Sequence, residues 1–397
     1  IYLLMPKLSL YFLYLINSVI SYFYSYKSSI LVADQRNYIV TGYNYVSTIV
    51  QSILQIVFLL LTHEYISYLL IQIICGITYN ISISKKASRD YPYIDDIVEE
   101  PLTKEETKDL FVNVKALAIN KLSGILVNNT DNIVMTYFNG IISVGLTSNY
   151  ILFSSTLDAL VTRLFSGLTG SVGNLNASVD DDKRYSFFKT LNLANFWLYG
   201  WAAIGMVFVS SDLVAWFYGA EYKLSSEIPL MLAINMFTIG MLHASYTYKS
   251  TLGLFKYGQY ILIFTGLINL VLDFILGRKF GIFGIYLATF IARLCTNLWY
   301  EPYAVYKYGL NINPIEYFKR YAYQILVLLV TCFGCYCVCS LINYSPMINS
   351  MLKIIVCTII PNSVFILCFR KTAEFNYIFD SMKRIISKIL RRTSTER

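Results

Sequence analysis

The chain has 397 residues, of which 56% are hydrophobic and 14% are charged, with a net charge of +8. Soluble globular domains carry about 25% charged residues, so the composition excludes that class. The apolar runs reach the length of membrane-spanning helices, unlike the short alternating segments of a membrane β-barrel. Basic residues lie at the ends of these runs, which indicates membrane topology and argues against nucleic-acid binding.

We predict an all-α integral membrane protein with about eleven transmembrane helices. Each apolar segment has close to the ~20 residues that a bilayer core requires. In chain order the predicted spans are 8–26, 39–62, 65–84, 112–137, 139–164, 188–209, 229–247, 258–277, 281–300, 321–342 and 349–369.

The distribution of Lys and Arg predicts the orientation. One set of alternate connections, which includes 85–110 and the tail after Phe369, holds 23 basic residues, and the opposite set holds 4. Cytoplasmic connections are enriched in Lys and Arg, so the C-terminus is predicted to be cytoplasmic. The tail 374–392 has an apolar face opposite a basic face, which is typical of a helix on an anionic membrane surface. Thr103 and Glu106 have the spacing of a capping box, which predicts a helix start in the linker.

The segments 25–38 and 247–260 align without gaps at an offset of 222 residues. Both leave one predicted span on the cytoplasmic side and enter the next. Equal topology indicates a parallel repeat, which some transporters have. The first copy has three fewer helices before it than the second, so we expect three helices to be missing ahead of the chain.

Five basic residues are predicted within the membrane, and three of them supply positive charge from the cytoplasmic side to the midplane: Lys121, Arg163 and Arg293. Charges are costly there, so they face protein or a water-filled cavity and mark functional sites. Positive charge in a cavity attracts an anion, and arginine suits phosphate geometry. The amides of Asn128 and Asn149 are predicted to line the same substrate cavity. The alternative is internal pairing with aspartates of the same spans.

Asp131 and Asp273 are predicted to lie at similar depths in the outer half of the membrane. Asn269 is one turn before Asp273, and Thr289 is near the middle of the following span. Such oxygen ligands can hold Na⁺ or a proton, so these four residues are a candidate site for a coupling cation. The alternative is that Asp273 pairs with Arg278 or Lys279 near the surface.

The sequence lacks the motifs of known soluble enzymes, such as a phosphate-binding loop, a zinc-ligand spacing or a nucleophile elbow. We therefore predict no catalytic residue, no metal centre and no cofactor. His243 within a span could act as a base, as in membrane acyltransferases, but packing roles are more common for a lone histidine.

Three segments resemble the polysaccharide-transporter branch of the MOP exporter superfamily: "SISKKASRDYPYI", "NKLSGILVNNTDNIVMTYFNGIISVGLTSNY" and "FGIFGIYLATFIARL". The resemblance implies a MATE-like transporter of two six-helix bundles with two additional helices. The chain then divides into 1–84, the remainder of an incomplete N-terminal bundle; 85–111, a cytoplasmic linker; 112–300, the C-terminal bundle; 301–370, two additional helices; and 371–397, a basic amphipathic tail.

The resemblance also implies a function. Such proteins flip undecaprenyl-diphosphate-linked oligosaccharides across the bacterial cytoplasmic membrane for O-antigen or capsule, which implies lipids and other polysaccharide assembly proteins as partners. Coupling to Na⁺ or H⁺ is expected. The alternatives are a MATE-type antiporter of cationic drugs, which the cavity cations disfavour, and a membrane-embedded polymerase or acyltransferase. A polymerase is expected to have a long external loop, and the longest external connection here, about 210–228, is short.

Overall fold

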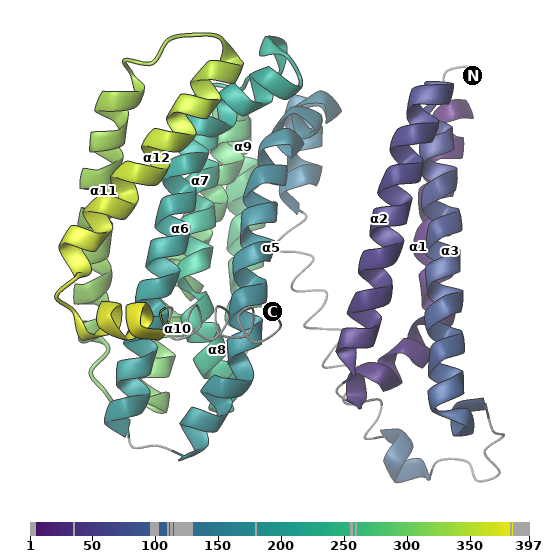
Figure 1. The fold of residues 1–397 in the computed structure, drawn as a ribbon, viewed down its shortest axis with the longest axis horizontal. Helices are drawn as coiled ribbons and strands as arrows, with labels where there is room; N and C mark the ends of the chain where they lie inside the picture. Colours follow the sequence, from purple (N-terminus) through teal and green to yellow (C-terminus); the bar gives the residue numbers. More distant parts are fainter. Residues whose placement is uncertain are drawn as a thin grey trace, which may run out of the picture. The chain divides into compact units, whose positions relative to one another are not determined.

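The computed structural model describes residues 5–34, 36–95, 103–108, 111, 114, 130–178, 181–254, 257–258, 260–381 and 383, and for some of these, including 163–178, the backbone alone. The described residues are helical or lie in the connections between helices, which confirms the predicted all-α class. Contacts divide the chain into two compact units, Ile1–Asp109 and Leu110–Arg397 (Figure 1). The boundary between them falls inside the predicted linker 85–111.

The first unit consists of three long helices: α1 (Met5–Ala33), α2 (Asn37–Thr62) and α3 (Tyr65–Asp90), followed by the short η1 (Pro92–Asp95). Helix α3 packs against both α1 and α2. A small core of Leu31, Ile83 and Ala87 joins α1 to α3 near one end. Much of the apolar surface of α2 faces outward, as expected for a helix in contact with lipid.

The linker contains the predicted helix start. Residues 104–108 are helical. The Thr103 backbone N–H donates to Glu106 Oε2 at 2.9 Å, and the Glu106 N–H donates to Thr103 Oγ1 at 3.3 Å. This reciprocal pair confirms the capping box. The same hydrogen bonds from Thr103 hold the pKa of the Glu106 carboxyl below its usual value.

The first continuous described segment of the second unit is a helix at 130–139. The elements that follow are α5 (Ile141–Ser178), α6 (Asp181–Phe217), η2 (Ala220–Tyr222), α7 (Glu227–Met241), α8 (His243–Thr251), α9 (Ile261–Cys295), α10 (Asn297–Ala304), the π-helical η4 (Val305–Gly309), α11 (Ile315–Cys339) and α12 (Pro346–Phe369). Residues 373–381 form one more helix.

Helix α6 is the centre of this bundle. It contacts α5, α7, α11 and α12, and its side chains Phe196 and Tyr199 are completely buried. Figure 1 shows α6 and α7 in the middle of the unit, with α11 and α12 on one side and α5 on the other. Helices α5 and α6 have 38 and 37 residues, so each extends beyond the predicted spans 139–164 and 188–209. Each is longer than a bilayer core is thick.

Helix α9 is a hairpin of two antiparallel arms, 261–280 and 282–295, that reverses at Gly281. The backbone of Gly281 has φ 59° and ψ −138°, a conformation that favours glycine. The hydroxyls of Thr265 and Thr296 are 2.7 Å apart although 31 residues separate them. A continuous helix would hold these residues about 46 Å apart. The reversal confirms the two predicted spans 258–277 and 281–300.

Among the described residues, seven helical segments are long and apolar enough to cross a membrane. One of them, Ile261–Gly309, contains the α9 hairpin and therefore includes both of its arms. The predicted span 8–26 lies within α1, and 139–164 lies within α5 apart from its first two residues; these helices are not among the seven. Most of the predicted span 112–137 lies outside the described residues. The protein is therefore a multi-pass membrane protein.

The predicted tail helix is seen over residues 373–381, and 384–397 lie outside the described residues. Phe375 stacks on Trp197 of α6 with ring centroids 5.8 Å apart. Glu374 accepts a 2.7 Å hydrogen bond from Arg320 of α11. Part of the apolar face that the sequence assigned to the membrane surface thus packs on the bundle.

Candidate functional site

The four residues predicted as a cation site lie together in the second unit. The helix 130–139 carries Asp131, the first arm of α9 carries Asn269 and Asp273, and the second arm carries Thr289. The Thr289 hydroxyl donates to Asp131 Oδ2 at 2.9 Å. The Asn269 amide donates to Asp273 Oδ1 at 3.1 Å and to Thr289 Oγ1 at 3.3 Å. We call these four residues the carboxylate cluster.

Two tight turns, at Gly140 and Gly281, lie against each other at one end of the helices that carry this cluster. The turn between 130–139 and α5 contains Asn139 and Gly140, and Gly140 has φ +79°. A Cβ built on Gly281 would lie 3.0 Å from the Asn139 amide nitrogen, so the turn of α9 lies against this first turn. Phe138 and Phe274 pack edge to face with centroids 5.9 Å apart. The helix 130–139 thus runs beside the first arm of α9.

Three members of the carboxylate cluster are buried, and the fourth, Asp131, is partly exposed. Asp273 has 0% exposure and Asn269 has 1%, which rules out the alternative that Asp273 pairs with lysine or arginine at the surface. Among the described residues, Asp131 Oδ1 and Asp273 Oδ2 are buried and have no hydrogen-bond donor. A buried carboxylate oxygen without a partner is unfavourable, and a bound cation or proton removes that cost.

The oxygen ligands of the carboxylate cluster suit a hard cation. Carboxylate, amide, hydroxyl and backbone carbonyl oxygens are the ligands of such ions. The carbonyl of Ile285, 3.2 Å from Thr289 Oγ1, adds a fifth oxygen. The carboxylate cluster has only two carboxylates, and the described residues contain no group of three or more His, Cys, Asp or Glu that could hold a metal ion. The two ends of the Asn269 amide can exchange by rotation, which would turn its oxygen toward the carboxylates.

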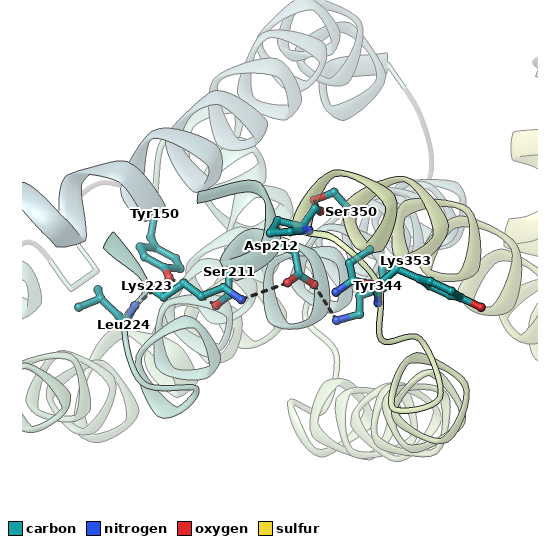
Figure 2. A network of polar contacts seen from close by, with 10 residues as sticks. Tyr150, Ser211, Asp212, Lys223, Leu224, Tyr344, Ser350 and Lys353 are labelled. Carbon is teal, nitrogen blue, oxygen red and sulfur yellow. Dashed lines mark hydrogen bonds and ion pairs between the residues drawn. The ribbon is translucent and has the colours of Figure 1, made fainter. Parts of the chain in front are cut away.

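Asp212, in the same unit, is a buried aspartate whose negative charge is neutralised by ion pairs with lysines. Figure 2 shows Asp212 between two lysines, Lys223 and Lys353. Their ammonium nitrogens are 3.3 Å and 2.7 Å from its two carboxylate oxygens. Glu301 is likewise compensated by Lys249 at 2.8 Å. By contrast, none of the ion pairs found between described residues involves Asp131 or Asp273.

Arg293 lies on the second arm of α9, one turn after Thr289. It is 9% exposed, and its Nη1 donates to Asn235 Oδ1 at 3.1 Å. Its charge interacts with that of Asp131. The sequence placed Arg293 in a substrate cavity that binds diphosphate, and the structure places it beside the carboxylate cluster.

The other residues predicted for the substrate cavity are not brought together by the described structure. Asn149 is on α5 and is partly buried. Lys121, Asn128 and the side chain of Arg163 lie outside the described residues. Their role in substrate binding stays a prediction.

A second polar group lies where α5, α6 and the α7–α8 junction meet. The Tyr199 hydroxyl donates to Asp158 Oδ1 at 2.6 Å, and His243 Nε2 is 3.5 Å from the same oxygen. The rings of Tyr199 and His243 stack with centroids 5.6 Å apart. His243 is thus a packing residue beside an aspartate, and the ring of Tyr199 covers one face of its imidazole.

Two residues beside the carboxylate cluster and Arg293 were not predicted from the sequence: Asn235 and Ile285. Asn235 is an amide inside the very apolar helix α7, and that isolated polarity was a usable signal. The contribution of Ile285 is a backbone carbonyl, which no side-chain pattern reveals.

No protein-family model matches the sequence, and no curated protein matches it. Among solved structures, the lipid II flippase MurJ in an inward closed conformation aligns with a TM-score of 0.60. The alignment covers 88% of this chain and 71% of the MurJ chain at 17% sequence identity. This likeness shows the fold alone. The chain therefore shares the all-helical fold of that structure.

Proposed function

We propose that this protein flips a lipid-linked oligosaccharide across the cytoplasmic membrane and that a gradient of Na⁺ or H⁺ drives the movement. The fold that it shares with the lipid II flippase MurJ supports a lipid-linked substrate. The resemblance of its sequence to polysaccharide transporters favours an undecaprenyl-diphosphate-linked repeat unit of a surface polysaccharide. The C-terminal tail is cytoplasmic in this proposal, because the basic residues favour that side.

The carboxylate cluster is the observation that carries the proposal. A transporter can use a cation gradient only if it binds the cation differently in its two conformations. The cluster joins helix 130–139 to both arms of α9, and its two orphaned oxygens lie where these helices meet. A cation that binds there stabilises one packing of the three helices. Its release allows another packing, which couples the ion to a change in helix arrangement.

The substrate would be held through its diphosphate. Lys121 and Arg163 supply positive charge in this proposal, and the amides of Asn128 and Asn149 bind sugar or phosphate oxygens. The lipid tail remains in the bilayer, so the protein needs to shield only the polar head during its passage. We assign no chemical step to the protein, since flipping makes and breaks no covalent bond.

Reconstitution into liposomes tests the proposal. The full chain is reconstituted with a fluorescent undecaprenyl-diphosphate-linked sugar, and an impermeant quencher in the external medium reports which leaflet holds the label. Flipping is measured with an Na⁺ gradient, a proton gradient or neither. We compare the wild type with Asp273→Asn, and we use Glu301→Gln as a control because Glu301 is a buried carboxylate with its own lysine.

We expect one of the gradients to accelerate flipping by wild-type protein and by Glu301→Gln. Asp273→Asn should flip at the rate seen without a gradient. If wild-type protein moves no lipid-linked sugar under any gradient, the flippase assignment is wrong. If Asp273→Asn responds to the gradient as fully as wild-type protein, the cluster is not the coupling site.

A further inference from the structure

A single arginine stands beside the carboxylate cluster without forming an ion pair. Arg293 is 9% exposed, and no carboxylate of the described residues lies within ion-pair distance of it. Its Nε is buried and has no acceptor among those residues. The charge of Arg293 interacts with that of Asp131, whose buried Oδ1 also has no hydrogen-bond partner among those residues. Arg293 and Asp131, two groups of opposite charge, therefore each have one buried atom without a hydrogen-bond partner among the described residues.

We propose that Arg293 is a fixed counter-charge that restricts the carboxylate cluster to one monovalent cation and excludes divalent cations. This inference rests on the proposed cation site and adds what that site selects. It assigns Arg293 to ion selectivity, where the sequence suggested binding of the substrate diphosphate.

The position of Arg293 is fixed by Asn235 of α7. The Asn235 amide nitrogen donates to the carbonyls of Met231 at 3.1 Å and Tyr286 at 2.9 Å. Both donors of this amide are thus directed at backbone carbonyls, so its oxygen must face Arg293. The guanidinium accordingly has a built hydrogen-bond partner that keeps it near Asp131 and out of a direct ion pair with it.

The charge count follows from the groups around the cluster. Asp131 and Asp273 together carry −2 when both are ionised, and Arg293 carries +1. The neighbouring titratable groups are the phenols of Tyr286 and Tyr246, which are neutral at physiological pH. Glu301 adds nothing, because Lys249 neutralises it.

The described groups therefore leave a net charge of −1. One monovalent cation, or one proton shared between the carboxylates, makes this buried region neutral. A divalent cation would leave it with an uncompensated positive charge, which is costly in a medium of low polarity. The two carboxylates are close enough for one to donate to the other when protonated, so a single proton can take the place of a single cation.

The same geometry argues against Arg293 as an anchor for phosphate. An anion that approaches its guanidinium would also approach Asp131, with which Arg293 already interacts. The side chain is buried between α7 and α9, and a diphosphate attached to a sugar and a lipid needs an open approach. A sodium ion or a proton does not.

The test measures which cations bind when the charge of Arg293 is removed. Purified full-length protein is titrated in detergent with NaCl, LiCl, CaCl₂ and MnCl₂, and the unfolding midpoint is recorded at each concentration. Bound Mn²⁺ is counted independently by electron paramagnetic resonance. Arg293→Gln removes the charge and retains hydrogen-bonding groups, and Arg293→Lys keeps the charge. Arg320→Gln is the control, because Arg320 pairs with Glu374 on another part of the unit.

We expect Na⁺ or Li⁺, and neither divalent ion, to stabilise wild-type protein, Arg320→Gln and Arg293→Lys. Arg293→Gln should bind Ca²⁺ and Mn²⁺ at least tenfold more tightly than wild type. Asn235→Asp is a second route to the same result, because it neutralises Arg293 without deleting it and should also admit divalent ions.

The outcomes separate this inference from the proposed function. If wild-type protein is stabilised by a monovalent cation, and Arg293→Gln and Asn235→Asp remain equally selective for it, the counter-charge role is wrong while the cation site stands. If no metal cation stabilises wild-type protein, and its unfolding midpoint changes with pH as that of Asp273→Asn does, the cation site itself is wrong, and this inference falls with it. If Arg293→Gln loses binding of a diphosphate-linked lipid and keeps its cation selectivity, Arg293 belongs to the substrate site.

Discussion

The hydroxyl of Thr289 donates a 2.9 Å hydrogen bond to Asp131 Oδ2, across 158 residues of sequence. This bond connects the second arm of α9 to the helix 130–139. Because the same hydroxyl also accepts from Asn269, Thr289 joins the two halves of the carboxylate cluster. Its loss should therefore weaken the cluster as a whole, and not one ligand alone.

Thr289→Val tests this position. Valine has nearly the same shape but no hydroxyl, so it leaves Asp131 with one more unsatisfied oxygen. Hydrogen bonds to charged groups contribute about 1.5–3 kcal/mol, which corresponds to at least tenfold in affinity. We expect the affinity for the stabilising monovalent cation to fall by about that factor, measured as the salt concentration that half-saturates the rise in unfolding midpoint.

Thr265→Val is the matched control for this change. The Thr265 hydroxyl bonds at 2.7 Å to Thr296, the residue directly after the second arm, and its other hydrogen bond is to the backbone carbonyl of Ile261. This variant should lower the unfolding midpoint and leave the cation affinity unchanged. Equal loss of cation affinity in both variants would mean that general loosening of the hairpin, and not the bond to Asp131, is responsible.

The members of the carboxylate cluster could be predicted from sequence because burying a charge in a membrane is costly. Asp273 stands out against apolar neighbours, Asp131 lies in a short polar run inside an otherwise apolar segment, and the spacing of Asn269 and Asp273 places them on one helix face. The reversal at Gly281 was predictable from the basic residues Arg278 and Lys279 between two apolar runs. These signals lie in short stretches of sequence, so they can be recognised without knowledge of the fold.

The environment of Arg293 was not predictable in the same way. Its partner Asn235 is 58 residues away on another helix, and no local pattern pairs them. The same holds for Asp212, whose two lysines come from the α6–α7 connection and from α12. Which buried charge meets which partner depends on how helices pack, and that information is tertiary.

The orientation predicted from Lys and Arg can be tested by thiol labelling. In a variant without the eight native cysteines, a single cysteine replaces Glu221 of η2 or Lys371 after α12. An impermeant thiol reagent in intact cells should label the cysteine at Glu221 and spare the one at Lys371. Labelling in the reverse pattern would place the tail outside, and lysed cells serve as the control for reactivity.

The ion pairs of Glu374 should make the stability of the folded protein depend on pH. Burial raises the pKa of this carboxyl, but Arg320 at 2.7 Å and Lys189 at 3.6 Å outweigh burial and leave the pKa below its ordinary value. A lowered pKa stabilises the folded state above the unfolded pKa of about 4.5, and this contribution is lost as pH falls through the folded value. The unfolding midpoint of wild type should exceed that of Glu374→Gln at pH 7, and the difference should shrink below about pH 4.5. A difference that is constant with pH would exclude this ion pair as its source.

Gly284 should be indispensable for the α9 hairpin. A Cβ at this position would lie 2.1 Å from the Leu276 carbonyl oxygen, a backbone atom that cannot move aside without opening the two arms. Gly284→Ala should therefore lower the unfolding midpoint strongly, since overpacking costs about 1–3 kcal/mol even where side chains can adjust. Because Thr289 is little more than one turn further along the arm, the variant should also weaken the cation response.

Gly205→Ala in α6 is the matched control, for a Cβ there meets nothing within 4 Å. It should fold as wild type does and keep its cation affinity. Normal stability of Gly284→Ala, measured beside Gly205→Ala in the same detergent, would show that the arms are not in close contact at this point.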